Sequence, residues 1–155
     1  MRRRRPERRE ILPDPVFNDL VVTKFINNIM LSGKRSKAEA IFYGCLKTIE
    51  SELKGEKGLE IFKKALDNTS PLLEVKSKRI GGATYQVPVE ISKNRSAALA
   101  MRWIIKYAKG RKGKTMSDKL AAELIAASKN DGSSIKKKED THKMAEANKA
   151  FAHFK

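Results

Sequence analysis

Residues 71–91, PLLEVKSKRIGGATYQVPVEI, constrain the fold most strongly because they alone have the pattern of paired β-strands. From Leu73 to Ile80 the alternation has a period of two, which places successive side chains on opposite faces of a strand. The Gly81-Gly82 pair provides positive φ at little steric cost, and the alternation resumes at Ala83. The sequence therefore predicts a β-hairpin at about residues 72–90.

An isolated two-stranded ribbon is only marginally stable in water, so this hairpin must pack its root on a core, extend its tip toward a partner, or do both. The ends of the ribbon are apolar and predict its root: Leu72, Leu73, Val87 and Val89. The part nearer the turn carries three cations: Lys76, Lys78 and Arg79. We therefore expect a buried root and a basic tip.

The composition indicates one domain and a polyanionic partner. At 155 residues the chain is in the range of a single domain with one core. It holds 34 Lys and Arg against 18 Asp and Glu, a net charge of +16, and self-repulsion of that size needs a compensating partner. No apolar run approaches the roughly 18 residues of a membrane span, and no apolar segment follows the basic N-terminus as in a secretory signal. We expect a soluble, cytoplasmic protein.

Residues 1–10, MRRRRPERRE, have no apolar anchor beyond the first residue and predict an arm that is disordered when free. Its six arginines are Arg2, Arg3, Arg4, Arg5, Arg8 and Arg9. A solvated tail and a nuclear import signal are the alternatives, but guanidinium groups match phosphate geometry, which favours ordering on phosphates. Residues 11–155 then form the helical domain.

Apolar periodicity predicts about six helices in that domain, so the fold class is mainly α with one protruding hairpin. The expected starts are Asn18 or Asp19, the capping box Ser36-Lys37-Ala38-Glu39, Leu59, Ser92, Thr115 or Ser117, and Ser133 or Ser134. The first helix runs to about Ser32, and its expected buried stripe is Leu20, Val21, Phe25, Ile29 and Met30.

Two further expectations concern side chains on these helices. Cys45 lies on the apolar stripe of the second helix, which favours a small buried side chain over a nucleophile. The last helix has only a thin apolar stripe that ends at Phe151, so we expect its C-terminal end to fray or project.

Cations gather at four places in the helical domain besides the hairpin. Lys34, Arg35 and Lys37 lie in a loop before a helix N-terminus, where anions are favoured. On the helix at about 93–109, four cations share one face: Arg95, Arg102, Lys106 and Lys109. The loop at 110–114 adds Arg111, Lys112 and Lys114, and the last helix begins with Lys136, Lys137 and Lys138.

The cation row at 93–109 is the most informative of these groups. A row of charges is usually a solvated face, but such faces interleave acids, and this helix contains no Asp or Glu. Phosphate contact is therefore favoured over simple solvation. The lysines at the start of the last helix oppose its dipole, which indicates a role other than stability.

Catalytic motifs are missing from the sequence. There is no Gly-rich phosphate loop, HExxH, CxxC or GxSxG motif. Asp140 and His142 are two residues apart and would face different ways on a helix, so we interpret His142 as a polar or RNA-facing residue. Two histidines and one cysteine do not make a closed zinc site. We expect no enzymatic activity, metal or cofactor.

Three blocks of the chain closely resemble the bacterial type of the small-subunit ribosomal protein family called S seven. They are residues 14–41, residues 79–91 with LAMRWII just after them, and residues 136–154, and the strings GGATYQVPVE and KxEDTHxMAEAN are the most specific. The resemblance implies a helical domain with one extended hairpin. It also implies binding to the 3′ major domain of 16S rRNA, nucleation of head assembly, and a place near the mRNA exit, exit-site tRNA and neighbouring ribosomal proteins.

By position, the resemblance assigns the basic groups named above to rRNA. It assigns to the neighbourhood of tRNA and mRNA the hairpin tip and part of the last helix: Gly81, Gly82, Ala83, His142 and Lys143. Several family arginines are lysines here, including Lys138 and Lys143, and lysine lacks the bidentate fork of arginine. We expect the protein to be a monomer when free and to have no membrane partner.

Two rival functions come from other classes. A DNA-bending architectural protein also joins a helical body to a basic β-ribbon, and it would need an apolar wedge at the ribbon tip, for which Ile80 is the one candidate. An RNA-modifying enzyme would need a cofactor loop or metal cluster, and the sequence has neither. Without the family resemblance, the residues predict a polyanion-binding protein and do not separate RNA from DNA.

Overall fold

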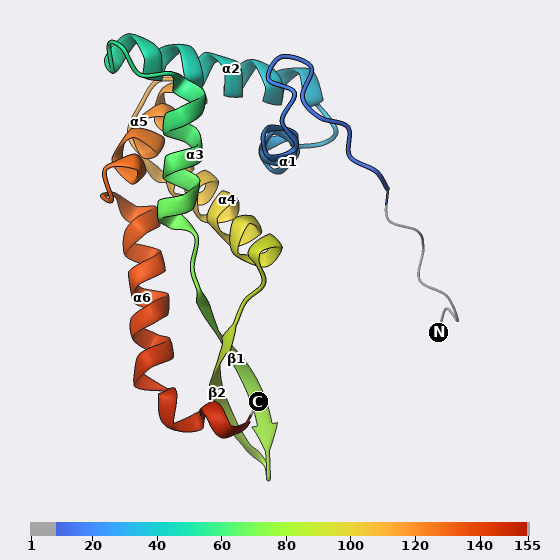
Figure 1. The fold of residues 1–155 in the computed structure, drawn as a ribbon, viewed down its shortest axis with the longest axis vertical. Helices are drawn as coiled ribbons and strands as arrows, with labels where there is room; N and C mark the ends of the chain where they lie inside the picture. Colours follow the sequence, from blue (N-terminus) through green and yellow to red (C-terminus); the bar gives the residue numbers. More distant parts are fainter. Residues whose placement is uncertain (1–8, 155) are drawn as a thin grey trace. The chain divides into compact units, whose positions relative to one another are not determined.

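The computed structural model describes residues 9–154, and in that range it is mainly α-helical with one β-hairpin, as expected (Figure 1). The elements are α1 (Leu20–Ile29), α2 (Arg35–Glu52), α3 (Gly58–Thr69), β1 (Leu73–Ile80), β2 (Ala83–Glu90), α4 (Lys93–Gly110), α5 (Met116–Ser128), α6 (Ser133–Ala147) and the 3-10 helix η1 (Lys149–Phe154). They belong to two compact units, one ending at Ala40 and the other beginning at Ile41. Most of the basic arm, residues 1–8, lies outside the described residues.

In the first unit, Asp19 caps α1 by accepting the backbone N–H of Val21 at 2.8 Å. The predicted stripe was partly wrong, because Leu20 and Val21 are 47% and 36% exposed. The buried positions follow the i, i+3, i+4, i+7 pattern of one helix face: Val22, Phe25, Ile26 and Ile29, with Thr23 beside them. The helix also ends at Ile29, three residues before the expected end, and Ser32 has a left-handed φ of 52°.

The predicted capping box before α2 is also wrong. The helix begins at Arg35, one residue before the expected cap Ser36. Glu39 lies one turn further on, and its carboxylate accepts the Arg35 Nε–H at 2.7 Å. An exposed i, i+4 ion pair therefore takes the place of the reciprocal cap.

In the second unit, α2 and α3 pack through their aromatic side chains. The rings of Phe42 and Phe62 meet edge to face with centroids 5.2 Å apart. Gly58 allows the helices to approach closely, since a Cβ there would lie 2.9 Å from the carbonyl oxygen of Leu46. Cys45 is buried in the same core, and burial, with a smaller effect of the nearby Asp118 carboxylate, raises its pKa to about 12. The prediction that Cys45 is a structural core residue is confirmed.

The hairpin has the predicted place and turn. Strands β1 and β2 pair antiparallel from Leu73 opposite Glu90 to Ile80 opposite Ala83. Gly81 and Gly82 have φ values of 57° and 89°, the positive values that a tight two-residue turn requires.

The expected root of the hairpin was only partly correct. Val87 is 2% exposed, but Leu72 is 75% exposed and does not join the core.

The C-terminal end lies against the hairpin and does not project, which corrects the sequence-based expectation. Figure 1 shows α6 running alongside the ribbon and η1 turning across it. The Phe151 ring packs on Tyr85 of β2, with centroids 5.3 Å apart. The thin stripe on α6 is sufficient because the ribbon provides the other half of the contact.

A buried carboxylate joins three segments of the second unit. Glu123 on α5 is fully buried, and it accepts hydrogen bonds from the backbone N–H and the hydroxyl of Ser134 at 3.0 and 2.6 Å. Its other oxygen forms an ion pair with Arg111, just beyond α4. The carboxylate also lies at the N-terminus of α6, where negative charge is favoured. Gly132 leaves space for the Arg111 side chain, because a Cβ at this position would lie 3.2 Å from the guanidinium.

Replacing Glu123 with Ala should lower the free energy of unfolding by about 3 kcal/mol, because Arg111 and the Ser134 N–H lose their shared partner inside the protein. Urea unfolding followed by circular dichroism measures this change. Glu60→Ala is the matched control, since Glu60 forms an exposed pair with Lys57 at 3.7 Å and should cost under about 1 kcal/mol. Equal effects of the two substitutions would contradict a structural role for the Glu123 carboxylate.

Candidate nucleic-acid interface

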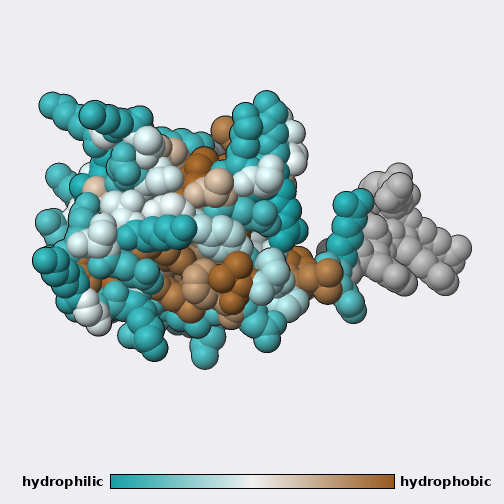
Figure 2. All heavy atoms as spheres, turned by 90° about the horizontal axis from the view of Figure 1, so that it is seen from above, coloured by the Kyte–Doolittle hydropathy of each residue, from teal (hydrophilic) through white to brown (hydrophobic). Residues whose placement is uncertain are grey.

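Helix α4 presents the predicted row of cations to solvent. All four members are exposed: Arg95, Arg102, Lys106 and Lys109. The opposite face is buried: Ala100, Met101, Ile104, Ile105 and Ala108. Helix α4 therefore has one core face and one charged face. Figure 2 shows one face of the molecule, on which hydrophilic side chains cover most of the surface and apolar atoms occupy a smaller area.

The first member of the row has a partner that the sequence did not reveal. The Arg95 Nε–H donates to Glu74 Oε2 on β1 at 3.3 Å, and Lys76 approaches the other oxygen of the same carboxylate at 3.3 Å. The Glu74 side chain is only 12% exposed. It therefore links the start of α4 to the hairpin and partly neutralises two of the predicted RNA-binding residues. Arg102, Lys106 and Lys109 form the more open part of the row.

The cations of the basic loop after α4 likewise include one that pairs with a carboxylate and two that are exposed. Arg111 is half-buried and paired with Glu123, so its guanidinium stabilises the fold. Lys112 and Lys114 are exposed and continue the cationic surface beyond α4.

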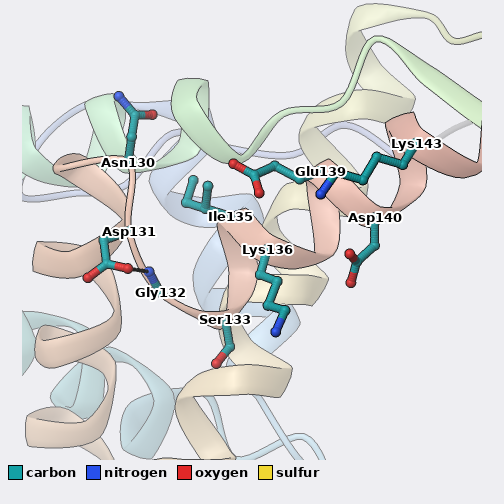
Figure 3. Close-up of a pocket in the computed structure, with 9 residues that line it drawn as sticks. All are labelled: Asn130, Asp131, Gly132, Ser133, Ile135, Lys136, Glu139, Asp140 and Lys143. Atoms are coloured by element: carbon teal, nitrogen blue, oxygen red, sulfur yellow. Dashed lines mark hydrogen bonds between the residues drawn. The ribbon is translucent and has the colours of Figure 1, made fainter. Parts of the chain in front are cut away.

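The start of α6 presents charges of both signs. Lys136 and Lys143 line an open cleft of about 450 Å³ together with Asp131, Glu139 and Asp140 (Figure 3). Figure 3 shows Lys136 and Asp140 on one side of the helix and Glu139 on the other, while Asp131 accepts the Gly132 N–H at 2.6 Å. Mixed charge makes this cleft a weaker anion site than the row on α4.

Lys138 and His142 hold the root of the hairpin. They lie one turn apart on α6, as i and i+4. The Lys138 ammonium donates to the carbonyl of Asn68 at 2.6 Å, near the C-terminus of α3, where positive charge is favoured. His142 Nε2 accepts the backbone N–H of Leu72 at 3.1 Å. Both were predicted to face nucleic acid, and the structure gives each an intramolecular partner.

Two more helices hold the same short segment, residues 68–72. The Asn68 amide donates to the carbonyls of Ala127 and Ser128 at the end of α5, at 2.9 and 3.0 Å. The Ser96 hydroxyl of α4 donates to the carbonyl of Pro71 at 2.7 Å. Side chains from α4 and α6 and backbone carbonyls from α5 therefore fix the direction in which the ribbon leaves the helical body.

The remaining predicted residues are exposed. In the first unit these are Lys34, Arg35 and Lys37, with Arg9 before them. Along the hairpin they are Lys76, Lys78, Arg79, Gly81, Gly82 and Ala83, and Lys137 on α6 is half-buried. Arg2, Arg3, Arg4, Arg5 and Arg8 fall outside the described residues. The assignment of all these residues to RNA stays a prediction.

The described residues contain no further chemistry that competes with charge recognition. Asp140 and His142 line different clefts, so they do not form a catalytic pair. Within residues 9–154 there is no group of three His, Cys, Asp or Glu side chains suited to a metal ion. No helix of this part of the chain is both long and apolar enough to cross a membrane.

A helical body with one fixed hairpin and exposed strips of cations defines a basic, polyanion-binding class of protein. Residues 1–149 match the family described as Ribosomal protein S7p/S5e. The chain is 60% identical over 154 residues to "Small ribosomal subunit protein uS7" of Anaeromyxobacter sp. (strain Fw109-5), covering 99% of this chain and 98% of that protein. It is 57% identical over 155 residues to the protein of the same name from Campylobacter jejuni subsp. jejuni serotype O:23/36 (strain 81-176), covering 100% and 99%.

The chain therefore belongs to the S7p/S5e family of ribosomal proteins. This is a family of structural ribosomal proteins and not of enzymes. The resemblance found in the sequence is confirmed.

The contact of His142 with Leu72 should depend on pH. Burial, with a smaller effect of the Lys138 ammonium, lowers the pKa of His142 from its usual value of 6.5, which keeps Nε2 available as an acceptor. The unfolded chain then takes up this proton at a higher pH than the folded chain. The stabilisation is therefore fully present above pH ~6.5 and is lost as the pH falls through the unfolded pKa toward the lower folded value.

An NMR titration of the His142 ring, in the folded protein and in urea, measures this difference. We expect the folded midpoint to lie below the midpoint in urea. The protection of the Leu72 amide against hydrogen exchange, relative to its intrinsic rate at each pH, should fall as the ring is protonated. A folded midpoint equal to or above the one in urea would contradict the hydrogen bond.

Proposed function

We propose that this protein is a structural constituent of the small ribosomal subunit that binds 16S-type rRNA directly. It binds the 3′ major domain, nucleates assembly of the head, and lies near the mRNA exit and the exit-site tRNA. It works in the cytoplasm, within the ribosome. Support comes from the family and from the printed name of its relatives, which are small ribosomal subunit proteins.

The single observation that carries RNA binding is the exposed cation face of α4. Arg102, Lys106 and Lys109 extend over about 10 Å of helix, and no acid interrupts them within α4. Their opposite face is buried, so the helix cannot turn away from a ligand. Folded RNA is recognised largely by shape and by phosphate and 2′-OH contacts, and a rigid row of cations fits that mode of binding.

The DNA-bending alternative finds little support at the tip of the ribbon. Its one candidate wedge, Ile80, is half-buried and pairs with Ala83 in the ladder. The turn residues Gly81 and Gly82 have no side chain to insert between bases. Family membership also favours RNA over duplex DNA.

Replacing Arg102, Lys106 and Lys109 together with Gln should weaken binding to the isolated 3′ domain of 16S rRNA by about tenfold or more at physiological salt. The slope of log K against log[salt] should become shallower by about two, because fewer counterions are released. Filter binding across a salt series measures both quantities.

The matched control replaces three exposed lysines away from the row, Lys47, Lys57 and Lys64, with Gln. It makes the same change in net charge and should leave the slope nearly unchanged. Both variants should melt at the wild-type temperature, since all six side chains are exposed. An unaltered slope in the α4 variant would exclude the row as an RNA surface.

The hairpin tip should act on tRNA and not on rRNA binding. Replacing residues 79–84 with Asn-Gly keeps Lys78 paired with Tyr85, and it keeps the contact of Tyr85 with Phe151. Arg79 is the one predicted rRNA-binding residue that the variant removes, so we expect rRNA affinity to fall by no more than about fivefold, together with altered exit-site tRNA occupancy or reading-frame maintenance in subunits that carry the variant. Normal behaviour in both assays would remove any role for the tip.

A further inference from the structure

The root of the hairpin and the C-terminal helices enclose a second cleft, of about 440 Å³. This volume is within the range of clefts that hold ligands or anchoring side chains. Its floor is apolar and includes Leu73, Pro88 and Ala145. At its edge, Leu72 is 75% exposed, although it is a large aliphatic side chain beside other apolar groups. The cleft therefore offers apolar surface that the chain itself leaves uncovered.

The charge around this cleft differs from the charge of the rest of the protein. Glu90 and Glu146 stand at its edge, both exposed, with Lys149 as the one cation among the lining residues. Neither carboxylate is in an ion pair with another residue of the described part of the chain. In a protein of net charge +16, a cleft with an acidic edge is unsuited to phosphate, because the carboxylates repel it.

We propose that this cleft binds a basic peptide segment of a neighbouring small-subunit protein. An aliphatic side chain of that segment enters the apolar floor and covers Leu72, and flanking Lys or Arg side chains pair with Glu90 and Glu146. The inference rests on the proposed function, because a constituent of the small ribosomal subunit has other ribosomal proteins within reach. A second copy of this chain is a poor occupant, since two molecules of charge +16 repel each other.

The charge of the edge gives a test in which the two kinds of partner predict opposite results. Replacing Glu90 and Glu146 with Lys raises the positive charge by four. If RNA lay on the cleft, this replacement would strengthen binding of the RNA. If a basic segment lies there, binding of that segment weakens. The control, Glu139→Lys with Asp140→Lys, makes the same charge change on α6 at the other cleft.

The readout is photo-crosslinking within small subunits reconstituted from 16S rRNA and purified ribosomal proteins. The probe is p-benzoylphenylalanine in place of Leu72, which lines the cleft and is 75% exposed. We expect a crosslink to one small-subunit protein, at an aliphatic residue with Lys or Arg within a few positions. Its yield should fall at least about fivefold in the Glu90/Glu146 variant and stay unchanged in the control.

Crosslinks to rRNA or tRNA, to a second copy, or to residues 154–155 of the same chain would overturn the proposal. A protein crosslink whose yield is the same in the Glu90/Glu146 variant as in the wild type would overturn it as well. These outcomes differ from failure of the proposed function, in which the wild-type protein would not bind the 3′ domain or enter the subunit at all. In that case both proposals fall.

Discussion

The hydrogen bonds that anchor residues 68–72 determine the direction in which the ribbon leaves the helical body. Two strands alone cannot fix their own direction, and here the Lys138 ammonium, the His142 ring, the Ser96 hydroxyl and backbone carbonyls of α5 hold the point where the ribbon begins. The contact of Tyr85 with Phe151 then holds the ribbon against η1, and the contact of Arg95 with Glu74 holds it against α4. The tip of the ribbon is thus carried by a stiff base.

Two of the acids of this basic protein lie where the architecture needs an ion pair with a cation. Glu123 holds Arg111 at the junction of α4, α5 and α6, and Glu74 holds Arg95 at the junction of α4 with the ribbon. The result is a division of labour among the cations. Those that meet a buried or half-buried carboxylate stabilise the fold, whereas Arg102, Lys106 and Lys109 remain exposed to a polyanion.

Features that depend on a local sequence pattern could be predicted from the sequence. Contacts between residues far apart in the chain could not. The hairpin followed from strand alternation around Gly81-Gly82, and the row on α4 followed from helical geometry, because each pattern lies within one element. The stripe of α1 was misplaced because apolar residues lie on more than one side of this short helix, so its sequence alone does not show which side packs on the core. Arg111, Lys138 and His142 looked like surface groups because their partners lie 12 to 70 positions away in the chain.

The burial of Cys45 has a practical consequence for following this molecule. Its thiol lies in the core with a pKa of about 12, so almost none of it is thiolate at neutral pH, and alkylating reagents have no open path to it. A cysteine introduced at the exposed Ala83 would then be the reactive one. An Ala83→Cys variant therefore accepts a single dye at the end of its ribbon while Cys45 stays in place.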